Sequence, residues 1–285
     1  MAGRARRTAR IRAAAGTYAN LVPFLFFALF PFYFMFVTSF KSNAELYNLK
    51  AIPFWIQTGA ITDHYTFLFM RTDFLTWIKN SLIVSVVATG VSLAIAILAG
   101  YSLARLRYRG VSSFGTAVFV TYLVPPTLLF LPLSQVVVWL GISDSIWALI
   151  VTYPTFLVPF STWLLMGYFR TVPREIEECA LVDGASRMQT LVRIVLPTAV
   201  PGIVCAALFG FTLCWNEFIY ALTFVSQTAS KTAVVGVTAD LIRGDIYYWG
   251  SLMAGAVLAS LPIVIVYVWF LDYYVSGLTA GAVKG

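Results

Sequence analysis

The chain has 285 residues, of which 60% are hydrophobic and only 11% are charged, and its formal net charge is +7. With a mean hydropathy of +0.85, it belongs among polytopic membrane proteins rather than soluble domains. Its single histidine, His64, and its three cysteines, Cys179, Cys205 and Cys214, form no CxxC pair and no Cys/His cluster. Neither a metal site nor a disulfide framework is therefore predicted.

Six stretches are apolar and long enough to cross a bilayer, which takes about 20 residues of helix. The predicted spans are 17–40, 78–101, 113–140, 146–168, 199–225 and 249–275. Several of them contain prolines, which a helix bundle tolerates when neighbouring groups satisfy the freed carbonyls. We therefore predict an all-α integral membrane protein whose transmembrane domain covers residues 17–275, between a basic arm (1–16) and a short tail (276–285).

Most basic residues lie in the loops and termini on one side of the predicted membrane spans. Of the 19, 13 lie before the first span, after the second, between the fourth and fifth, or in the tail. Because loops rich in Lys and Arg stay in the cytoplasm, both termini and the connection 169–198 are predicted to be cytoplasmic. This sorting explains the net charge without a nucleic-acid partner. The first apolar run is too long for a secretory signal and lacks a small-residue cleavage site, so we interpret it as a retained helix.

The longest predicted external segment, 41–77, mixes polar and aromatic residues. Aromatic side chains favour the interface between membrane and water. This segment is therefore predicted to fold over the outer mouth of the helix bundle, and His64 within it is not expected to do chemistry.

The connection 169–198 holds the densest cluster of acidic residues in the chain, and its pattern predicts a helix, a sharp turn and a second helix. Pro173 suits a first helical position. Early helical positions, where the helix dipole favours negative charge, are taken by Glu175, Glu177 and Glu178. Gly184 is placed to end this helix in a left-handed conformation, and Ser186 with Gln189 forms a capping box that starts the next one.

Ile176, Cys179 and Ala180 are spaced i, i+3, i+4 and are predicted to share one face of the first loop helix. Two small side chains on that face would let another backbone approach closely. The second loop helix is predicted to run to a break at Pro197. These features indicate a docking surface, while periodicity alone also allows an amphipathic loop that merely lies on the membrane.

Glu217 is the clearest ionisable residue within a predicted span, and such residues are usually functional. Together with Asn216 and Trp215, it would hydrogen-bond and stack on a sugar if it faced a transport path. The competing interpretation is that Glu217 lies near the outer end of its span and holds a neighbouring helix or loop. Asp272, near the inner end of the sixth span, is expected to snorkel or to pair with a cytoplasmic arginine.

No Gly-X-X-X-X-Gly-Lys-Ser/Thr phosphate loop occurs in the sequence, so ATP binding of that kind is not predicted. With one histidine and no Gly-X-Ser-X-Gly elbow, no catalytic triad is available either. The chain is predicted not to be an enzyme and to bind no cofactor, so a separate subunit would have to supply energy.

The loop carries a longer motif: Glu178-X-Ala180, three residues, Gly184, nine residues, and Ile194-X-Leu196-Pro197. This spacing resembles the cytoplasmic signature of ABC-importer permeases, although Cys179 stands where that family usually has a second alanine. In that family the loop forms a coupling helix that sits in a cleft of the ATPase subunit.

The resemblance therefore implies an ATPase-coupling site, made of Ile176, Glu178, Cys179, Ala180, Asp183 and Gly184. Glu178 is expected to pair with a polar or basic group on the ATPase. Gly184 is expected to set the turn that transfers force.

Other segments are similar to the sugar-importer branch of the same family. They are Ser39–Ser42 with Glu45-Leu46, Asn80–Leu82, Gly100–Arg105 and Trp215–Phe218. The last residues, 277–285, look like the tail of maltose-type permeases, which reaches between the two ATPase subunits. By that resemblance, Thr279, Gly281 and Lys284 would contact the ATPase.

The resemblance implies the six-helix fold of a type I importer permease in a bacterial inner (plasma) membrane, with these partners. A second homologous permease would share the pathway, two ATPase subunits would use ATP and Mg, and an extracytoplasmic binding protein would deliver a sugar, oligosaccharide or polyol. Transport would proceed by alternating access. The competing hypotheses are an ion-coupled secondary transporter, with Glu217 as its proton-binding acid, and a non-transporting scaffold or receptor.

Overall fold

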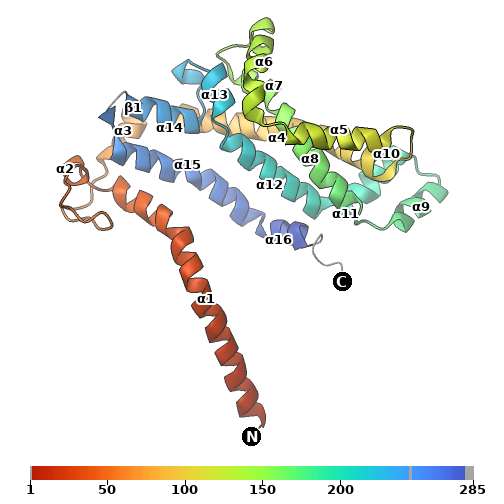
Figure 1. Ribbon diagram of the computed structural model, residues 1–285, viewed down its shortest axis with the longest axis horizontal. Helices are drawn as coiled ribbons and strands as arrows, with labels where there is room; N and C mark the ends of the chain where they lie inside the picture. The colour runs from red at the N-terminus through yellow and green to blue at the C-terminus, as the bar shows by residue number, and fades with distance from the viewer. Residues whose placement is uncertain (1, 244–245, 280–285) are drawn as a thin grey trace. The chain divides into compact units, whose positions relative to one another are not determined.

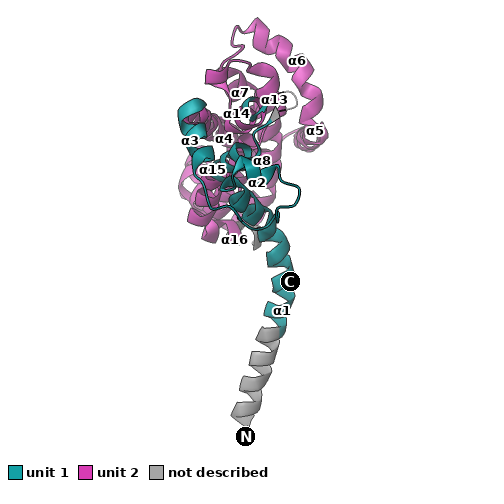
Figure 2. Cartoon of the chain, turned by 90° about the vertical axis from the view of Figure 1, so that its left-hand side faces the viewer, with its two compact units in different colours: residues 1–72, 240–258 teal, residues 73–239, 259–285 magenta. Residues whose placement is uncertain are grey.

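The computed structural model describes residues 2–243 and 246–279, which are mostly helical (Figure 1). The prediction of an all-α protein is confirmed. Within the described residues, β structure is limited to an antiparallel pair of two-residue strands, β1 (Ile242–Arg243) and β2 (Ile246–Tyr247). The chain divides into two compact units, residues 1–72 with 240–258 and residues 73–239 with 259–285 (Figure 2).

The first unit contains α1 (Ala2–Ser39), α2 (Asn43–Leu46), α3 (Asp63–Arg71) and the start of α15 (Trp249–Trp269). α1 continues unbroken through Pro23 and Pro31. His64 is buried, and its two ring nitrogens lie 2.9 Å from the carbonyl oxygen of Lys41 and 3.3 Å from Ser251 Oγ. Both nitrogens are thus engaged in structural hydrogen bonds, in line with the expectation that this residue does no chemistry.

Glu45 organises the segment between α2 and α3. Its carboxylate accepts hydrogen bonds from the backbone N–H groups of Gln57 and Thr58 and from the Thr58 hydroxyl, and it lies 3.2 Å from Lys41 Nζ. Burial by itself would raise the pKa of Glu45, but these hydrogen bonds outweigh it and lower the pKa to about 2. The loop is therefore folded around an ionised carboxylate.

The second unit contains the remaining helices. They are α4 (Phe74–Arg105), α5 (Val111–Leu123), α6 (Pro126–Trp139), α7 (Ile146–Thr152), α8 (Pro154–Phe169), α9 (Arg174–Val182), α10 (Arg187–Thr190), the π-helix η1 (Leu191–Val195), α11 (Leu196–Thr198), α12 (Val200–Trp215), α13 (Ile219–Phe224), the 3-10 turn η2 (Thr228–Ser230), most of α14 (Ala233–Leu241), the end of α15, and α16 (Leu271–Thr279). Its apolar core forms two clusters, one around Tyr153, Leu157 and Tyr220 and the other around Leu165, Phe169 and Val195.

Among the described residues, four helical stretches are long and apolar enough to cross a membrane, and up to six spans result if each of two bent helix pairs counts as one. The four are Gly16–Ser39, Phe74–Arg105, Ile146–Phe169 and Trp249–Trp269. They overlap the predicted first, second, fourth and sixth spans. Multiple membrane crossings are thus supported by length and composition.

The predicted third span, 113–140, is not one straight helix. It is split into α5 and α6, which bend by 95° at the break between them. The physical reason is Pro125-Pro126: the residue before a proline is pushed out of the helical region, and Val124 is extended, with ψ of 119°. The expectation that prolines are absorbed within the spans is wrong at this pair.

The predicted fifth span, 199–225, also differs from the structure. Its helix α12 ends at Trp215, and a second short helix, α13, follows after a break at residues 216–218. Before α12, the chain bends by 79° between the helical stretches Arg187–Thr198 and Val200–Trp215. The break predicted at Pro197 thus lies two residues later, at Ala199, because the missing N–H of proline costs nothing within the first turn of α11.

Candidate functional site

The acidic loop forms α9, a sharp turn and α10, the arrangement that its capping residues predict. Figure 1 shows α9 at one end of the second unit, past the ends of α8 and α10. Pro173 lies one position earlier than expected. It is the N-cap, with an extended ψ of 134°, and Arg174 is the first helical residue.

Gly184 ends α9 in the left-handed conformation, with φ of +85°. The N–H of Gly184 donates to the carbonyl of Leu181 at 3.2 Å, and the N–H of Ala185 donates to the carbonyl of Ala180 at 3.0 Å. These two bonds make a Schellman motif, which satisfies carbonyls that the helix end leaves free. A Cβ at Gly184 would meet no atom within 4 Å, so the glycine is required by backbone conformation and not by space.

The capping box that starts α10 is confirmed. The Ser186 hydroxyl accepts from the Gln189 backbone N–H at 3.3 Å, and the Gln189 side chain accepts from the Ser186 backbone N–H at 2.7 Å. After one turn, α10 widens into the π-helix η1. Both ends of the turn are therefore fixed by local hydrogen bonds, which leaves little freedom between α9 and α10.

Glu177 fastens α9 to the end of α4. It is buried, its Oε1 lies 2.7 Å from Arg105 Nε, and its Oε2 accepts a hydrogen bond from the Tyr101 hydroxyl at 3.2 Å. Arg105 also donates to the carbonyl of Val172, just before α9. Sequence reasoning missed this anchor, since it treated Glu177 only as one of three acids that suit a helix N-terminus.

The two faces of α9 differ in their surroundings. Ala180 is buried on the same side as Glu177, whereas Ile176 and Cys179 are exposed. Only part of the face predicted from the i, i+3, i+4 spacing is therefore exposed, because Ala180 is covered by the protein's own chain. The exposed face consists of Glu175, Ile176, Glu178, Cys179, Val182 and Asp183.

Val182 is the most exposed apolar side chain of α9, at 88%, and Met188 on α10 is 58% exposed. Neither residue was predicted from the sequence. Val182 is the last residue of α9, directly before the Asp183-Gly184 turn, and an apolar residue at such a polar helix end could have been noticed. Cys179 is exposed, whereas Cys205 and Cys214 are buried. The exposed surface of α9 and α10 thus presents apolar side chains that are flanked by carboxylates.

A pocket of about 280 Å³ lies beside α9. Besides Leu181, it is lined by four arginines and two glutamates: Arg105, Arg107, Arg174, Arg187, Glu177 and Glu178. Arginines outnumber carboxylates, so the pocket has a positive balance. Glu178 therefore borders arginines of its own chain.

Glu217 lies in the break between α12 and α13. Its carboxylate accepts from the backbone N–H groups of Tyr220 and Ala221, at 2.8 and 3.0 Å, and from the Tyr153 hydroxyl at 3.0 Å. A carboxylate that receives several N–H groups at the start of a helix acts as its cap. This geometry favours the structural interpretation of Glu217.

The neighbours of Glu217 are also engaged within the protein. Trp215 is buried and its indole N–H donates to the carbonyl of Ala259 at 3.1 Å. The Asn216 side chain donates to the carbonyl of Thr212 in its own helix at 2.9 Å. Trp215, Asn216 and Glu217 thus each use a side-chain polar group in a hydrogen bond within the protein.

The predicted tail contacts fall at the end of the described chain. Thr279 is the last residue of α16, while Gly281 and Lys284 lie outside the described residues. Asp272, in the first turn of α16, is exposed and makes no ion pair with any arginine in the described part of the chain. The expected pairing of Asp272 is therefore not found.

Comparison with known proteins links this arrangement to transport. Residues 93–279 match the family described as binding-protein-dependent transport system inner membrane component. The chain is 38% identical to the inner membrane ABC transporter permease protein YcjP of Escherichia coli (strain K12), over 95% of this chain and 96% of the relative. It is 35% identical to the diacetylchitobiose uptake system permease protein DasC of Streptomyces coelicolor, over 90% and 92%.

A further relative is the trehalose/maltose transport system permease protein MalG of Thermococcus litoralis, 33% identical over 90% of this chain and 92% of the relative. Among solved structures, the fold is similar to a chain of a bacterial ABC transporter involved in the import of the acidic polysaccharide alginate. The TM-score is 0.75 at 22% identity, and the match covers 94% of this chain and 98% of the other.

Proposed function

The chain belongs to the family of binding-protein-dependent transport system inner membrane components, and on this premise we propose that it is the permease subunit of an ATP-driven carbohydrate importer. As a member of that family it is a multi-pass inner-membrane protein. The solutes named for its relatives are diacetylchitobiose, trehalose with maltose, and maltodextrin. They support a sugar or an oligosaccharide as the solute here; a polyol stays an expectation from the sequence.

One observation carries the proposal: α9 is anchored on its inner face and free on its outer face. Glu177 ties the inner face to α4 through Arg105 and Tyr101. The outer face exposes Ile176 and Val182 beside three carboxylates. A helix that is rigidly attached to a membrane helix, and that displays apolar side chains at its surface, is suited to receive a partner and to pass on its movement.

The partner that we propose for this face is a cytoplasmic ATPase subunit. Two such subunits, one on this chain and one on a second homologous permease, would use ATP and Mg. An extracytoplasmic binding protein would deliver the solute to the pathway between the two permeases. Movement of the ATPase would displace α9, and the Arg105–Glu177 ion pair would carry this displacement to the end of α4, so that the cavity alternately opens to each side.

Charge supports the same assignment. The arginine-lined pocket beside α9 has a positive balance, which suits an acidic side chain of the partner. Glu178, at the edge of this pocket, and Asp183 are exposed and suit a polar or basic group. Docking would thus combine apolar contacts of Ile176, Cys179 and Val182 with charge pairs of both signs.

Glu217 has a positioning role in this proposal. Its two oxygens already accept three hydrogen bonds that join α13 to Tyr153 of the α7–α8 junction. Both carboxylate oxygens are therefore occupied by contacts within the protein. This arrangement argues against Glu217 as the proton-binding acid of an ion-coupled secondary transporter.

The transport class is tested by uptake of labelled carbohydrates into cells that express the complete transporter. We expect uptake to stop when ATP is depleted and to continue when a protonophore collapses the proton gradient. Survival of uptake without ATP, together with loss under the protonophore, would instead identify an ion-coupled transporter.

Docking on α9 is tested with the natural exposed thiol of Cys179, because the other two cysteines are buried. In inverted membrane vesicles, we expect a maleimide to label Cys179 after the ATPase has been stripped and to label it at least several-fold less after the ATPase is added back. A matched control is Ser113→Cys in a Cys179→Ser background, which places an exposed thiol at the start of α5. Equal labelling of Cys179 in both states would contradict docking on this face.

A further inference from the structure

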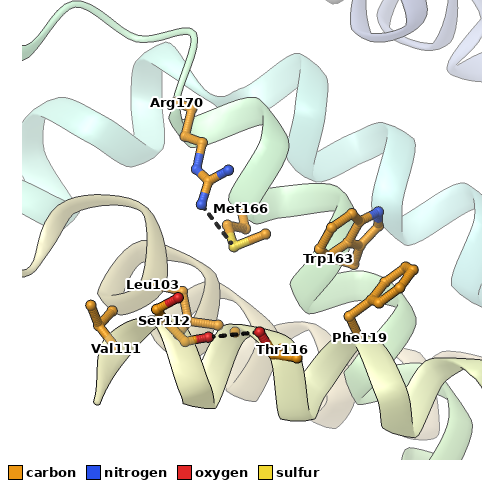
Figure 3. A pocket seen from close by; sticks show the side chains of 9 residues that line it. Leu103, Val111, Ser112, Thr116, Phe119, Trp163, Met166 and Arg170 are labelled. Carbon is orange, nitrogen blue, oxygen red and sulfur yellow. Dashed lines mark hydrogen bonds between the residues drawn. The ribbon is translucent and has the colours of Figure 1, made fainter. Parts of the chain in front are cut away.

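A second pocket, of about 390 Å³, lies away from the acidic loop helix, between the last turns of α4 and α8 and the first half of α5 (Figure 3). This volume is within the range of about 300–1,000 Å³ that is usual for small-molecule sites. Met166 and Trp163 line it from α8, Arg170 lines it from the residue directly after α8, and Ser112, Thr116 and Phe119 line it from α5. None of these residues takes part in the proposed docking of the ATPase.

The lining changes in character from one end of the pocket to the other. Figure 3 shows Arg170 and Met166 across from Ser112 and Thr116, while Trp163 and Phe119 face each other further along. The rings of Phe119 and Trp163 have centroids 4.7 Å apart. One end therefore carries a guanidinium and two hydroxyls, and the other end is aromatic and apolar.

This change runs along the helix axis, from the ends of the apolar helices towards their middle. Arg170 comes directly after α8, and Val111 is the first residue of α5, so the polar end lies where apolar helices begin and end. From Val111 to Phe119, eight residues of helix advance about 12 Å, from the surface into the apolar region. A phospholipid has the same order of parts: an anionic headgroup at the surface and acyl chains below it.

The positive charge at the mouth is available to an anion. Arg170 is exposed and has no carboxylate partner in the described part of the chain; its side-chain hydrogen bond is to Met166 Sδ, at 3.5 Å. A thioether is only a weak acceptor.

We propose that this pocket binds one anionic phospholipid from the leaflet on the side of the acidic loop, which is predicted to be cytoplasmic. The headgroup phosphate would accept hydrogen bonds from Arg170 and from the Ser112 hydroxyl, while the Thr116 hydroxyl stays bonded to the Ser112 carbonyl at 3.0 Å. An acyl chain would lie along Phe119 and Trp163. Basic pockets between membrane helices on the cytoplasmic side are suited to such headgroups. The proposal does not depend on which solute is transported or on where the ATPase docks.

Two variants test the two halves of the pocket in the intact transporter. Arg170→Gln removes the charge at the mouth. Gly115→Leu fills the cavity from within α5, where a Cβ would meet only Leu103 Cδ2, at 3.9 Å, so the backbone need not shift. Their matched controls are Arg109→Gln, a nearby arginine outside the pocket, and Gly167→Leu, a helical glycine with open space around it.

The measurement is native mass spectrometry of the purified transporter, titrated with phosphatidylglycerol or phosphatidylcholine, or with inorganic phosphate alone. We expect one phosphatidylglycerol to bind at least tenfold more tightly than phosphatidylcholine, and millimolar phosphate not to displace it. Arg170→Gln is expected to remove this preference, and Gly115→Leu to abolish binding of the lipid. Both control variants are expected to bind like the natural protein.

Three results would each overturn the proposal. Equal binding of phosphatidylglycerol by all four variants would place the lipid elsewhere. Displacement by phosphate alone would identify a free anion as the ligand. A cross-link from Ser112→Cys to the second permease in the lipid-free complex, combined with the absence of bound phosphatidylglycerol, would show that protein covers the pocket.

Discussion

Each of the two units contains one buried ion pair within the described residues, and the two pairs serve their surroundings differently. In the first unit, Lys41 and Glu45 are one helical turn apart, and Glu45 also holds Gln57 and Thr58 of the same loop. In the second unit, Arg105 and Glu177 belong to different helices, α4 and α9. The first pair closes a loop on itself, whereas the second joins a surface helix to a membrane helix.

This difference indicates which pair matters for coupled movement. A local pair stabilises one segment and can break without consequences elsewhere. A pair between helices must be intact for one helix to move with the other. We therefore expect disruption of Arg105–Glu177 to affect transport, and disruption of Lys41–Glu45 to affect only its own loop.

The largest effect is expected for Glu177→Ala. Removing one partner of a buried ion pair leaves the other charge uncompensated and typically costs about 3–5 kcal/mol. ATP-dependent uptake should fall more than tenfold at an equal amount of protein in the membrane. Glu175→Ala, on the exposed side of the same helix, is the control and should stay close to the natural protein.

Stability and coupling are separated by the double variant Arg105→Met with Glu177→Met. Replacing both charges with apolar side chains of similar size is often neutral or stabilising. Thermal unfolding in detergent should therefore recover relative to Glu177→Ala. If Glu177→Ala and Glu45→Ala reduce uptake equally, the contrast between the two pairs is wrong.

The next largest effect is expected for Gly184→Val. The left-handed φ of +85° costs an L-residue about 1–2 kcal/mol, and more for a β-branched side chain. Membrane insertion should be unaffected, while binding of the ATPase should weaken about tenfold in a pull-down titration. Gly184→Asn should lose much less, because asparagine tolerates this conformation; equal losses for Val and Asn would point to a steric cause instead.

A smaller effect is expected for Ser186→Ala. It removes the side-chain half of the capping box at the start of α10, a change that usually costs about 1 kcal/mol. Uptake should fall only a few-fold, and Ser186→Asp should restore it, because aspartate is an equally good N-cap. A restored cap without restored uptake would show that the hydroxyl acts in some other way.

The smallest effect on uptake, and a purely local one, is expected for Glu45→Gln. Because the pKa of Glu45 is about 2, below its ordinary value of 4.5, its carboxylate stabilises the loop fully above about pH 4.5, and this stabilisation is lost as the pH falls towards about 2. Hydrogen exchange at the amides of Gln57 and Thr58 should be faster in Glu45→Gln than in the natural protein above pH 4.5. The ratio of the two rates should approach one near pH 2, and uptake at neutral pH should be unchanged.

Local features of the fold were predictable from the sequence because short stretches determine them. Hydropathy located four of the long helices, and Gly184, Ser186 and Gln189 predicted the turn between α9 and α10. Capping and left-handed glycine depend on neighbours within four residues, so no knowledge of the tertiary structure was needed.

Features that depend on distant partners were not predictable in the same way. Neither Arg105 nor Glu177 is unusual in its own segment, and their contact arises only when α4 and α9 pack together. The burial of Ala180, on the same side of α9, likewise depends on the packing of other helices. Likewise, Glu217 is recognisable as an acid within an apolar stretch, but its hydrogen bond with Tyr153 comes from the α7–α8 junction, 64 residues away in the sequence.

The bend at Pro125-Pro126 has a consequence for biosynthesis. The Tyr220 hydroxyl donates to the carbonyl of Pro126 at 3.1 Å, although the two residues are 94 positions apart. At about 5–20 residues per second, a ribosome needs roughly 5–20 seconds to make the intervening chain. During that interval, the nascent segment that contains Pro126 must enter the membrane without Tyr220. The bend between α5 and α6 therefore gains this hydrogen bond only after the following helices have been translated.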